Sequence, residues 1–204
     1  RNASTGAEKE VVRFGGSKAP GGFSPDGVWL YAGVSEAGNS DIYRVRVVGG
    51  AVEKVVEGWG LEVSPSPSPD GRRIAFVSDR GGSPQVYVKT IGVAGETRIS
   101  NGTNYATSPS WSPAGDRIAY TVRSGGRFVI ETVAPDGSDL REVASAADGD
   151  CEDPSFSPDG RSLVYTYRKS GYSALKIIAS DGRRQRTLVS GLENVGSPAW
   201  SPGR

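Results

Sequence analysis

The stretch FSPDGRSLVYTY, residues 156–167, decides the fold because the chain contains several near-copies of it. Related stretches are FSPDGVWLYA from Phe23, PSPDGRRIAFVS from Pro67 and SPSWSPAGDRIAYT from Ser108, and the chain ends on PAWSPGR. The serine of each Ser-Pro pair recurs in steps of 44 or 45 residues, at Ser24, Ser68, Ser112, Ser157 and Ser201. A fixed period in this range predicts a repeat architecture, which is a solenoid, a propeller or an array.

The content of one period chooses between these architectures. In the second repeat, the pair Asp70-Gly71 predicts a tight turn, and residues 74–77, 86–88 and 97–99 predict short strands. A further strand around the Ser-Pro phrase makes four strands per period, and no segment has a sustained helical periodicity. Four short antiparallel strands in every period predict an all-β propeller of four-stranded blades.

The second strand of each repeat is apolar on both faces. In the second repeat Ile74 and Phe76 point one way, whereas Ala75 and Val77 point the other way. A sheet with one solvated face would alternate apolar with polar residues instead. Two buried faces are expected of a blade that is stacked between two others.

The Asp-Gly pair also has a local structural reason. A tight hairpin turn needs a residue with positive φ, which glycine adopts without steric cost, and the aspartate can bond backbone groups within the turn. We therefore interpret Ser-Pro-Asp-Gly as a folding device and not as a catalytic motif.

The repeats define a single expected domain over residues 1–204. Its four complete repeats are expected at about 20–63, 64–107, 108–152 and 153–196. Residues 1–19 and 197–204 are expected to contribute to a shared, incomplete closing blade.

The repeated phrase resembles the PD40 or TolB-like propeller repeat, in which an aromatic-Ser-Pro-Asp-Gly turn precedes an apolar-Ala-aromatic strand and a Ser-Asp-Arg loop. Residues 156–160 match this phrase fully, while Pro67 replaces the aromatic residue and Ala114 and Gly203 replace the aspartate. The chain has no Gly-His and no Trp-Asp dipeptide, so it differs from the WD40 pattern.

The ends of the chain bear on how the ring closes. Residues 198–202 are similar to the Pro-Ala-Trp-Ser-Pro phrase on which TolB proteins finish, and residues 9–12 align with a fourth strand. The second and third strands of the closing blade are then missing, and the resemblance implies six blades and a separate α/β domain. We therefore expect a piece of a longer protein. A small strained ring, a five-bladed ring with one thin blade, and strand exchange between chains all stay open.

Composition excludes several functions. A net charge of +1 does not provide the excess of positive charge that nucleic-acid binding needs. With no histidine in the chain, a Ser-His-Asp triad and a His-ligated metal are excluded. Cys151 is alone, forms no intramolecular disulfide, and is expected to be a buried thiol. No apolar run is long enough to span a membrane, so we expect no membrane insertion.

Carboxylates are the remaining residues with chemical potential. Glu62, Glu152 and Asp153 are expected in loops before a first strand, near one mouth of the channel. Paired carboxylates are the residues that glycosidase chemistry uses, and with backbone carbonyls they also hold Ca²⁺. We expect solvated loop acids, no catalytic residue and no cofactor, with Ca²⁺ in the channel as the alternative.

The predicted binding site is the end of the propeller formed by two sets of loops. The loops from a fourth strand to the next blade contain Trp59, Glu62, Asn104, Tyr105, Glu152, Asp153 and Asn194. The loops between second and third strands contain Asp79, Arg80, Arg123 and Arg168. Aromatic and arginine side chains in loops are typical of recognition surfaces.

These observations predict a non-catalytic propeller that binds a protein or peptide. The TolB resemblance implies the bacterial periplasm and a peptidoglycan-associated lipoprotein as partner, and the incomplete blade adds self-association. The alternatives are the substrate-gating propeller of a prolyl-oligopeptidase-type peptidase and a carboxylate-dependent lyase or glycosidase.

Overall fold

The computed structural model describes residues 15–36, 38–101, 105–192 and 195–200, which contain strands and turns but no helix. The strands form four antiparallel sheets, each of four strands in chain order, which we call blades 1 to 4. Blade 1 contains β1 (Ser17–Phe23), β2 (Trp29–Glu36), β3 (Asn39–Arg46) and β4 (Val52–Val56). Blade 2 contains β5 (Val63–Pro67), β6 (Arg73–Ser78), β7 (Gln85–Thr90) and β8 (Thr97–Arg98). Blade 3 contains β9 (Ala106–Trp111), β10 (Ile118–Ser124), β11 (Arg127–Val133) and β12 (Arg141–Ala144). Blade 4 contains β13 (Asp150–Phe156), β14 (Ser162–Lys169), β15 (Tyr172–Ala179) and β16 (Arg186–Leu192).

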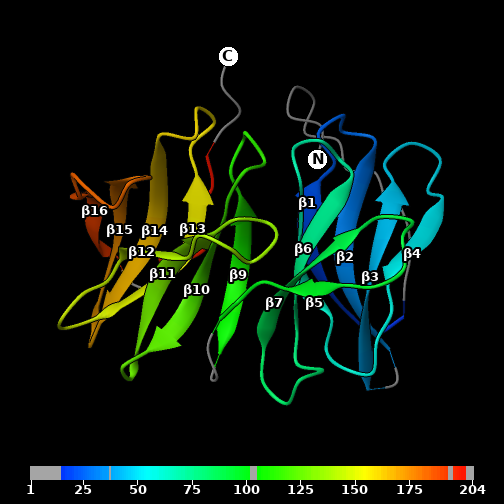
Figure 1. Ribbon diagram of the computed structural model, residues 1–204, viewed down its shortest axis with the longest axis horizontal. Coiled ribbons are helices and arrows are strands. Elements are labelled where there is room, and N and C mark those ends of the chain that lie inside the picture. Colours follow the sequence, from blue (N-terminus) through cyan, green and yellow to red (C-terminus); the bar gives the residue numbers. More distant parts are fainter. Residues whose placement is uncertain (1–14, 37, 102–104, 193–194, 201–204) are drawn as a thin grey trace.

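The blades follow one another across the molecule in chain order, from the blue blade 1 on the right of Figure 1 to the orange blade 4 on the left. The first strands are the innermost: β1 contacts β5, β5 contacts β9, and β9 contacts β13. The expected all-β propeller with four-stranded blades is confirmed. The expected fourth strand at residues 9–12 lies outside the described residues. No helix in the described part of the chain is long and apolar enough to cross a membrane.

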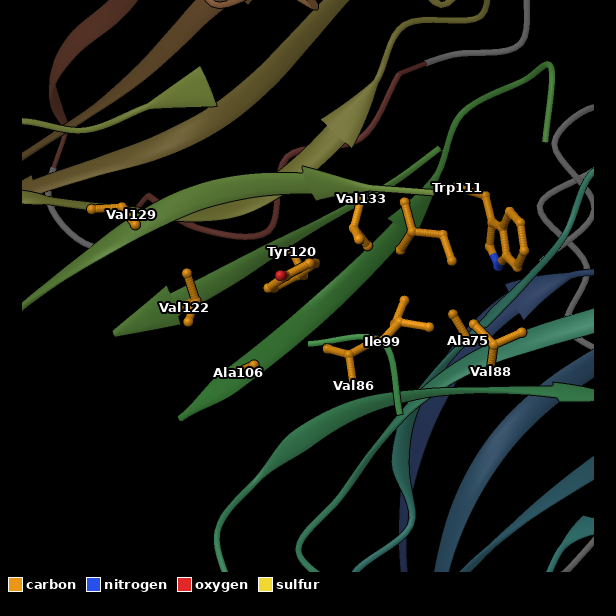
Figure 2. Packing of buried hydrophobic residues seen from close by; sticks show 11 residues of the cluster. Ala75, Val86, Val88, Ile99, Ala106, Trp111, Tyr120, Val122, Val129 and Val133 are labelled. Atoms are coloured by element: carbon orange, nitrogen blue, oxygen red, sulfur yellow. The ribbon is translucent and has the colours of Figure 1, made fainter. Parts of the chain in front are cut away.

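The hydrophobic core consists of layers between successive blades. Figure 2 shows the layer between blades 2 and 3, where side chains of β6 and β7 meet those of β9, β10 and β11. Its members are Ala75, Val86, Val88, Ile99, Ala106, Trp111, Ile118, Tyr120, Val122, Val129 and Val133. Similar layers separate blade 1 from blade 2 and blade 3 from blade 4.

Strand β6 confirms the prediction of two buried faces. Ile74 and Phe76 pack in the layer towards blade 1, whereas Ala75 packs in the layer towards blade 3. Successive side chains of a strand point to opposite faces, so one strand supplies both layers. The aromatic residue of this strand recurs as Tyr120 in β10 and Tyr165 in β14, and all of these rings are fully buried.

The Ser-Pro-Asp-Gly phrase forms the turn between the first and second strands. The Ser68 hydroxyl donates to Asp70 Oδ1 at 2.5 Å and accepts from the amide of Arg73 at 2.9 Å. Gly71 has a φ of 68°, which glycine adopts at no steric cost. The hydroxyl of Ser68 and the amide of Arg72 hold the pKa of Asp70 below its ordinary value. The same bonds recur in blade 1 and blade 4, so the phrase is a folding device, as predicted.

Blade 3 builds this turn with a different aspartate. Ala114 stands where the other turns have aspartate, and the Ser112 hydroxyl donates instead to Asp116 Oδ1 at 2.7 Å. Ser112 still accepts from the amide of Arg117 at 3.0 Å. Asp116, two residues further along the chain, therefore provides the acceptor that Ala114 lacks.

The innermost strands share an irregularity next to the axis of the propeller. Ser64, Ser108, Asp153 and Ser197, each followed by proline, have φ values of 52°, 53°, 54° and 49°. In β5 and β13 the pairing with the second strand shifts register at this point, which is the mark of a β-bulge. The four residues line one cavity of about 360 Å³ on the axis, which we call the axial channel.

Candidate functional site

The two sets of loops predicted to bind a partner lie at the same end of the blades, which we call the loop face. This follows from the meander, because the entry to a first strand and the exit from the second strand share one end of a sheet. The described parts of the loop face are residues 38, 57–62, 79–84, 99–101, 105, 125–126, 145–149 and 170–171. Hydrogen bonds join the two sets: the amide of Leu61 donates to Asp79 Oδ1 at 2.8 Å, and that of Arg123 donates to the Tyr105 carbonyl at 2.9 Å.

Glu62 lies beneath the loop face and is fully buried. Its Oε1 accepts a hydrogen bond from the Ser78 hydroxyl at 2.9 Å and forms an ion pair with Arg80 Nη2 at 3.0 Å. Its Oε2 has no hydrogen-bond partner among the described residues. Burial raises the pKa of this carboxyl above its ordinary value. The expectation of a solvated acid is therefore wrong for Glu62, because the loop folds back over its side chain.

Arg80 connects this carboxylate to a second one. Its Nη1 contacts Glu96 Oε2 at 3.0 Å, and Glu96 is also paired with Lys89 at 2.7 Å. The guanidinium lies over the rings of Phe76 and Tyr87, 5.6 and 5.1 Å from their centroids. Sequence reasoning missed Glu96, because it lies in the β7–β8 turn at the other end of the blade, and only the folded blade lets the Arg80 side chain reach it across Phe76 and Tyr87.

Trp59 protrudes from the loop that covers this network, and its side chain is 98 % exposed. The flanking glycines let the loop lie close to blade 2. A Cβ at residue 58 would be 2.3 Å from Glu62 Oε1, and one at residue 60 would be 2.5 Å from Asp79 Oδ1. A cavity of about 390 Å³ opens here, lined by Asn39, Glu57, Gly58, Trp59 and Arg80, and we call it the Trp59 pocket.

The boundary between blades 2 and 3 contributes Tyr105 and Arg123. Tyr105 makes an edge-to-face contact with Phe128, with ring centroids 5.7 Å apart, and remains partly exposed. Arg123, near the end of β10, is exposed. The structure thus brings these two predicted residues together, while Asn104 lies outside the described residues.

The boundary between blades 3 and 4 contributes Glu152 and Arg168. The carboxylate of Glu152 pairs with Arg168 Nε at 2.6 Å. The expectation that Glu152 lies in a loop is wrong. Glu152 lies inside β13, because this strand begins at Asp150. A second pair joins Lys169 to Asp148 at 2.6 Å. The predicted Asn194 lies outside the described residues.

Asp153 faces the axial channel and not the loop face. Its Oδ1 accepts from the Ser108 hydroxyl at 2.8 Å, and its Oδ2 accepts from the amide of Ser197 at 3.2 Å. The backbone amide of Asp153 donates to Thr121 Oγ1 at 3.0 Å. The expectation that this residue lies in a loop is therefore wrong, because the bulge of β13 turns its side chain towards the neighbouring inner strands.

The chain contains no histidine and one cysteine, Cys151. Among the described residues, no group of three or more His, Cys, Asp or Glu side chains lies close enough to hold a metal ion. Cys151 is buried, as predicted, and burial raises the pKa of its thiol to about 11. A thiol of this kind is protonated at neutral pH and is a poor nucleophile.

These features define the chain as a β-propeller that presents aromatic and charged side chains at one end. Residues 1–204 match the PD40 family, described as the TolB beta propeller domain, and the chain belongs to this family. The resemblance predicted from the repeated phrase is therefore confirmed. No curated protein matches the chain.

Solved structures agree with this assignment. TolB from Acinetobacter baumannii is 31 % identical with a TM-score of 0.86, and the match covers 98 % of this chain and 50 % of that chain. The chain thus spans half the length of that TolB. A protein assigned as TolB from Agrobacterium tumefaciens is 24 % identical with a TM-score of 0.75, covering 82 % of this chain and 63 % of that chain. A prolyl endopeptidase structure is 16 % identical with a TM-score of 0.64, covering 86 % of this chain and 30 % of that chain, and shares the fold alone.

Proposed function

We propose that this chain is a non-catalytic propeller that binds a protein or peptide at its loop face. The observation that carries the proposal is Trp59, which is almost wholly exposed although its loop is anchored on both sides. The amide of Glu62 donates to the Ser40 carbonyl of blade 1 at 2.8 Å, and the amide of Leu61 donates to Asp79 of blade 2 at 2.8 Å. Because the loop backbone is already anchored, a partner that covers the exposed indole does not have to order the loop, and tryptophan is enriched among interface hot spots.

The state of the carboxylates supports a non-catalytic role. Glycosidase chemistry needs two carboxyl groups that flank the same scissile bond. Here Glu62 is buried and paired with Arg80, Glu152 is paired with Arg168, and Asp153 is bonded within the axial channel. The three acids thus lie in separate networks. The likeness to a prolyl endopeptidase is a likeness of fold and carries no activity to this chain.

Family membership supports the setting of the proposal. Because the chain belongs to the TolB propeller family, we propose the bacterial periplasm as its setting and a peptidoglycan-associated lipoprotein as its partner. The loop face suits such a partner because aromatic and arginine side chains are enriched in protein interfaces: Trp59 and Arg80 lie at the first blade boundary, Tyr105 and Arg123 at the second, and Arg168 at the third.

Titration calorimetry with a soluble peptidoglycan-associated lipoprotein from the same bacterium tests the proposal. We expect a one-to-one complex that the Trp59→Ala variant weakens at least about tenfold, which is the effect of losing a hot-spot residue. Val48→Ala is the matched control, because Val48 is 75 % exposed in the β3–β4 turn at the opposite end of blade 1. No binding by the unaltered chain, or equal losses in both variants, would overturn the proposal.

A further inference from the structure

The Trp59 pocket has a charge character that limits what it can bind. The carboxylates of the connected network and its loop outnumber the cations: they are Asp41, Glu57, Glu62, Asp79 and Glu96, against Lys54, Arg80 and Lys89. An anion entering the pocket would meet this excess of negative charge, whereas a cation would be attracted by it.

The single arginine at the pocket does not reverse this balance. Arg80 directs Nε to the Ser78 hydroxyl at 3.0 Å, Nη1 to Glu96 and Nη2 to Glu62, each at 3.0 Å. Its charge is thus divided between two carboxylates. Beneath Gly58, which lines the pocket, lies the carboxylate of Glu62, whose Oε1 is the atom nearest to a Cβ built at residue 58 and is bonded to Ser78 and Arg80. Below the floor, Glu62 and Glu96 are balanced by Arg80 and Lys89, so the excess of negative charge comes from Asp41, Glu57 and Asp79 against Lys54.

The solvent-accessible side chains of the pocket are also of the types that bind a cation. Glu57 has a side chain that is 74 % exposed, and its ion pair among the described residues is with Lys54 at 3.1 Å, a cation that Glu57 shares with Asp41. The indole of Trp59 offers the aromatic face that attracts a cation best. A volume of about 390 Å³ is near the lower end of the usual range for ligand sites, roughly 300–1,000 Å³, and suits one long side chain.

We propose that the Trp59 pocket receives a lysine or arginine side chain of the protein partner. In this interaction the indole of Trp59 covers the cation and Glu57 supplies the carboxylate. Arg80, paired with Glu62 and Glu96, holds the floor of the pocket in place. The inference rests on the proposed function of the loop face and names the chemistry that one part of that face recognises.

The test uses nuclear magnetic resonance of the Trp59 indole N–H, identified by its absence in Trp59→Phe. The probes are Nα-acetyl-lysinamide and Nα-acetyl-argininamide, with the uncharged Nα-acetyl-norleucinamide as a probe of similar length. We expect saturable shifts of the Trp59 signal with the cationic amides alone, and weaker binding at high salt. Equal shifts with norleucinamide, or no saturable shift with either cationic amide, overturn the inference.

Matched variants separate a local charge effect from a general one. Glu57→Gln is expected to weaken the cationic amides by about three- to tenfold, the size of one partly exposed charge contact. Glu53→Gln is the control, because Glu53 is an exposed carboxylate of β4 that bonds Arg44, outside the pocket. Equal effects of the two variants would assign the binding to overall charge and refute the inference.

The two proposals fail separately. If the lipoprotein binds but the cationic amides do not, the loop face stands and the charge preference of the Trp59 pocket is wrong. If the amides bind and the lipoprotein does not, the pocket stands and the named partner is wrong.

Discussion

The indole nitrogen of Trp200 donates a hydrogen bond to the carbonyl oxygen of Ser155 at 3.0 Å. Trp111 makes the same bond to Ser66 at 2.9 Å, and in both pairs the two residues are 45 positions apart. Residues 195–200 thus lie against β13 as β9 lies against β5. Residues 195–200 therefore continue the ring past blade 4, at the place of the next inner strand.

This relationship predicts the effect of Trp111→Phe. The substitution removes the indole donor to the Ser66 carbonyl and leaves a gap between blades 2 and 3, so we expect the free energy of unfolding to fall by about 1–3 kcal/mol. Urea unfolding measures the change. Trp59→Phe should alter the free energy of unfolding by less than about 0.5 kcal/mol because that side chain is exposed. Similar losses in the two variants would contradict this account.

The turn of blade 3 predicts a compensating pair of substitutions. Asp116→Ala removes the acceptor of the Ser112 hydroxyl and should cost about 1 kcal/mol. Adding Ala114→Asp should restore most of this loss, because the aspartate would then stand where Asp26, Asp70 and Asp159 stand in the other turns. Thermal unfolding of the single and double variants measures the loss of stability and its recovery. A double variant no more stable than Asp116→Ala would refute the equivalence of the two positions.

The close approach of the Trp59 loop to blade 2 predicts a cost for Gly58→Ala. The added Cβ would lie 2.3 Å from Glu62 Oε1, so the loop or the ion pair has to shift, at about 1–3 kcal/mol. Gly81→Ala is the control, because its Cβ would meet only the Tyr87 hydroxyl at 3.5 Å, an ordinary contact. Urea unfolding, together with the indole signal of Trp59, measures both effects. A Gly58→Ala variant as stable as Gly81→Ala would show that the loop is not pressed onto the network.

Because Glu62 is buried, we expect the free energy of unfolding to depend on pH, and Arg80→Met should make this dependence steeper. Burial raises the pKa of Glu62 above its reference value of 4.5, so the folded state binds the proton more tightly than the unfolded state. Its contribution to stability is therefore greatest at low pH and falls as the pH rises through the window above 4.5. Arg80→Met leaves the charged carboxylate without its cation and should cost about 3 kcal/mol at neutral pH, at the low end for buried pairs because Arg80 is 25 % exposed.

Urea midpoints between about pH 5 and pH 8 measure this effect. The loss in Arg80→Met should shrink as the pH falls, since protonation removes the unpaired charge. The double variant Arg80→Met with Glu62→Gln should lose this slope. A cost of Arg80→Met that does not change with pH would contradict the account.

Much of the candidate site could be predicted from residue order, because the loops of a regular meander alternate between two ends. Trp59, Asp79, Arg80, Tyr105, Arg123 and Arg168 were placed at the loop face or beside it in this way. Glu62 lies in its predicted loop, but its burial could not be predicted, and Glu152 and Asp153 lie in β13 and not in a loop, since a carboxylate in a stretch of glycine, serine and proline carries no local sign of its surroundings. Their surroundings come from residues of other strands, such as Ser78 for Glu62 and Ser108 for Asp153.

The repeats and the turns can be recognised in the sequence because their causes are local. These causes are a period of 44 or 45 residues, apolar alternation, and a Ser-Pro-Asp-Gly turn whose serine and aspartate bond each other. The ion-pair network of Arg80, the rescue of Ser112 by Asp116, and the axial bonds of Asp153 depend on how strands and blades pack. Hydrogen bonds and ion pairs act over a few ångströms, so those between residues far apart in the sequence exist only once the fold has brought the residues together.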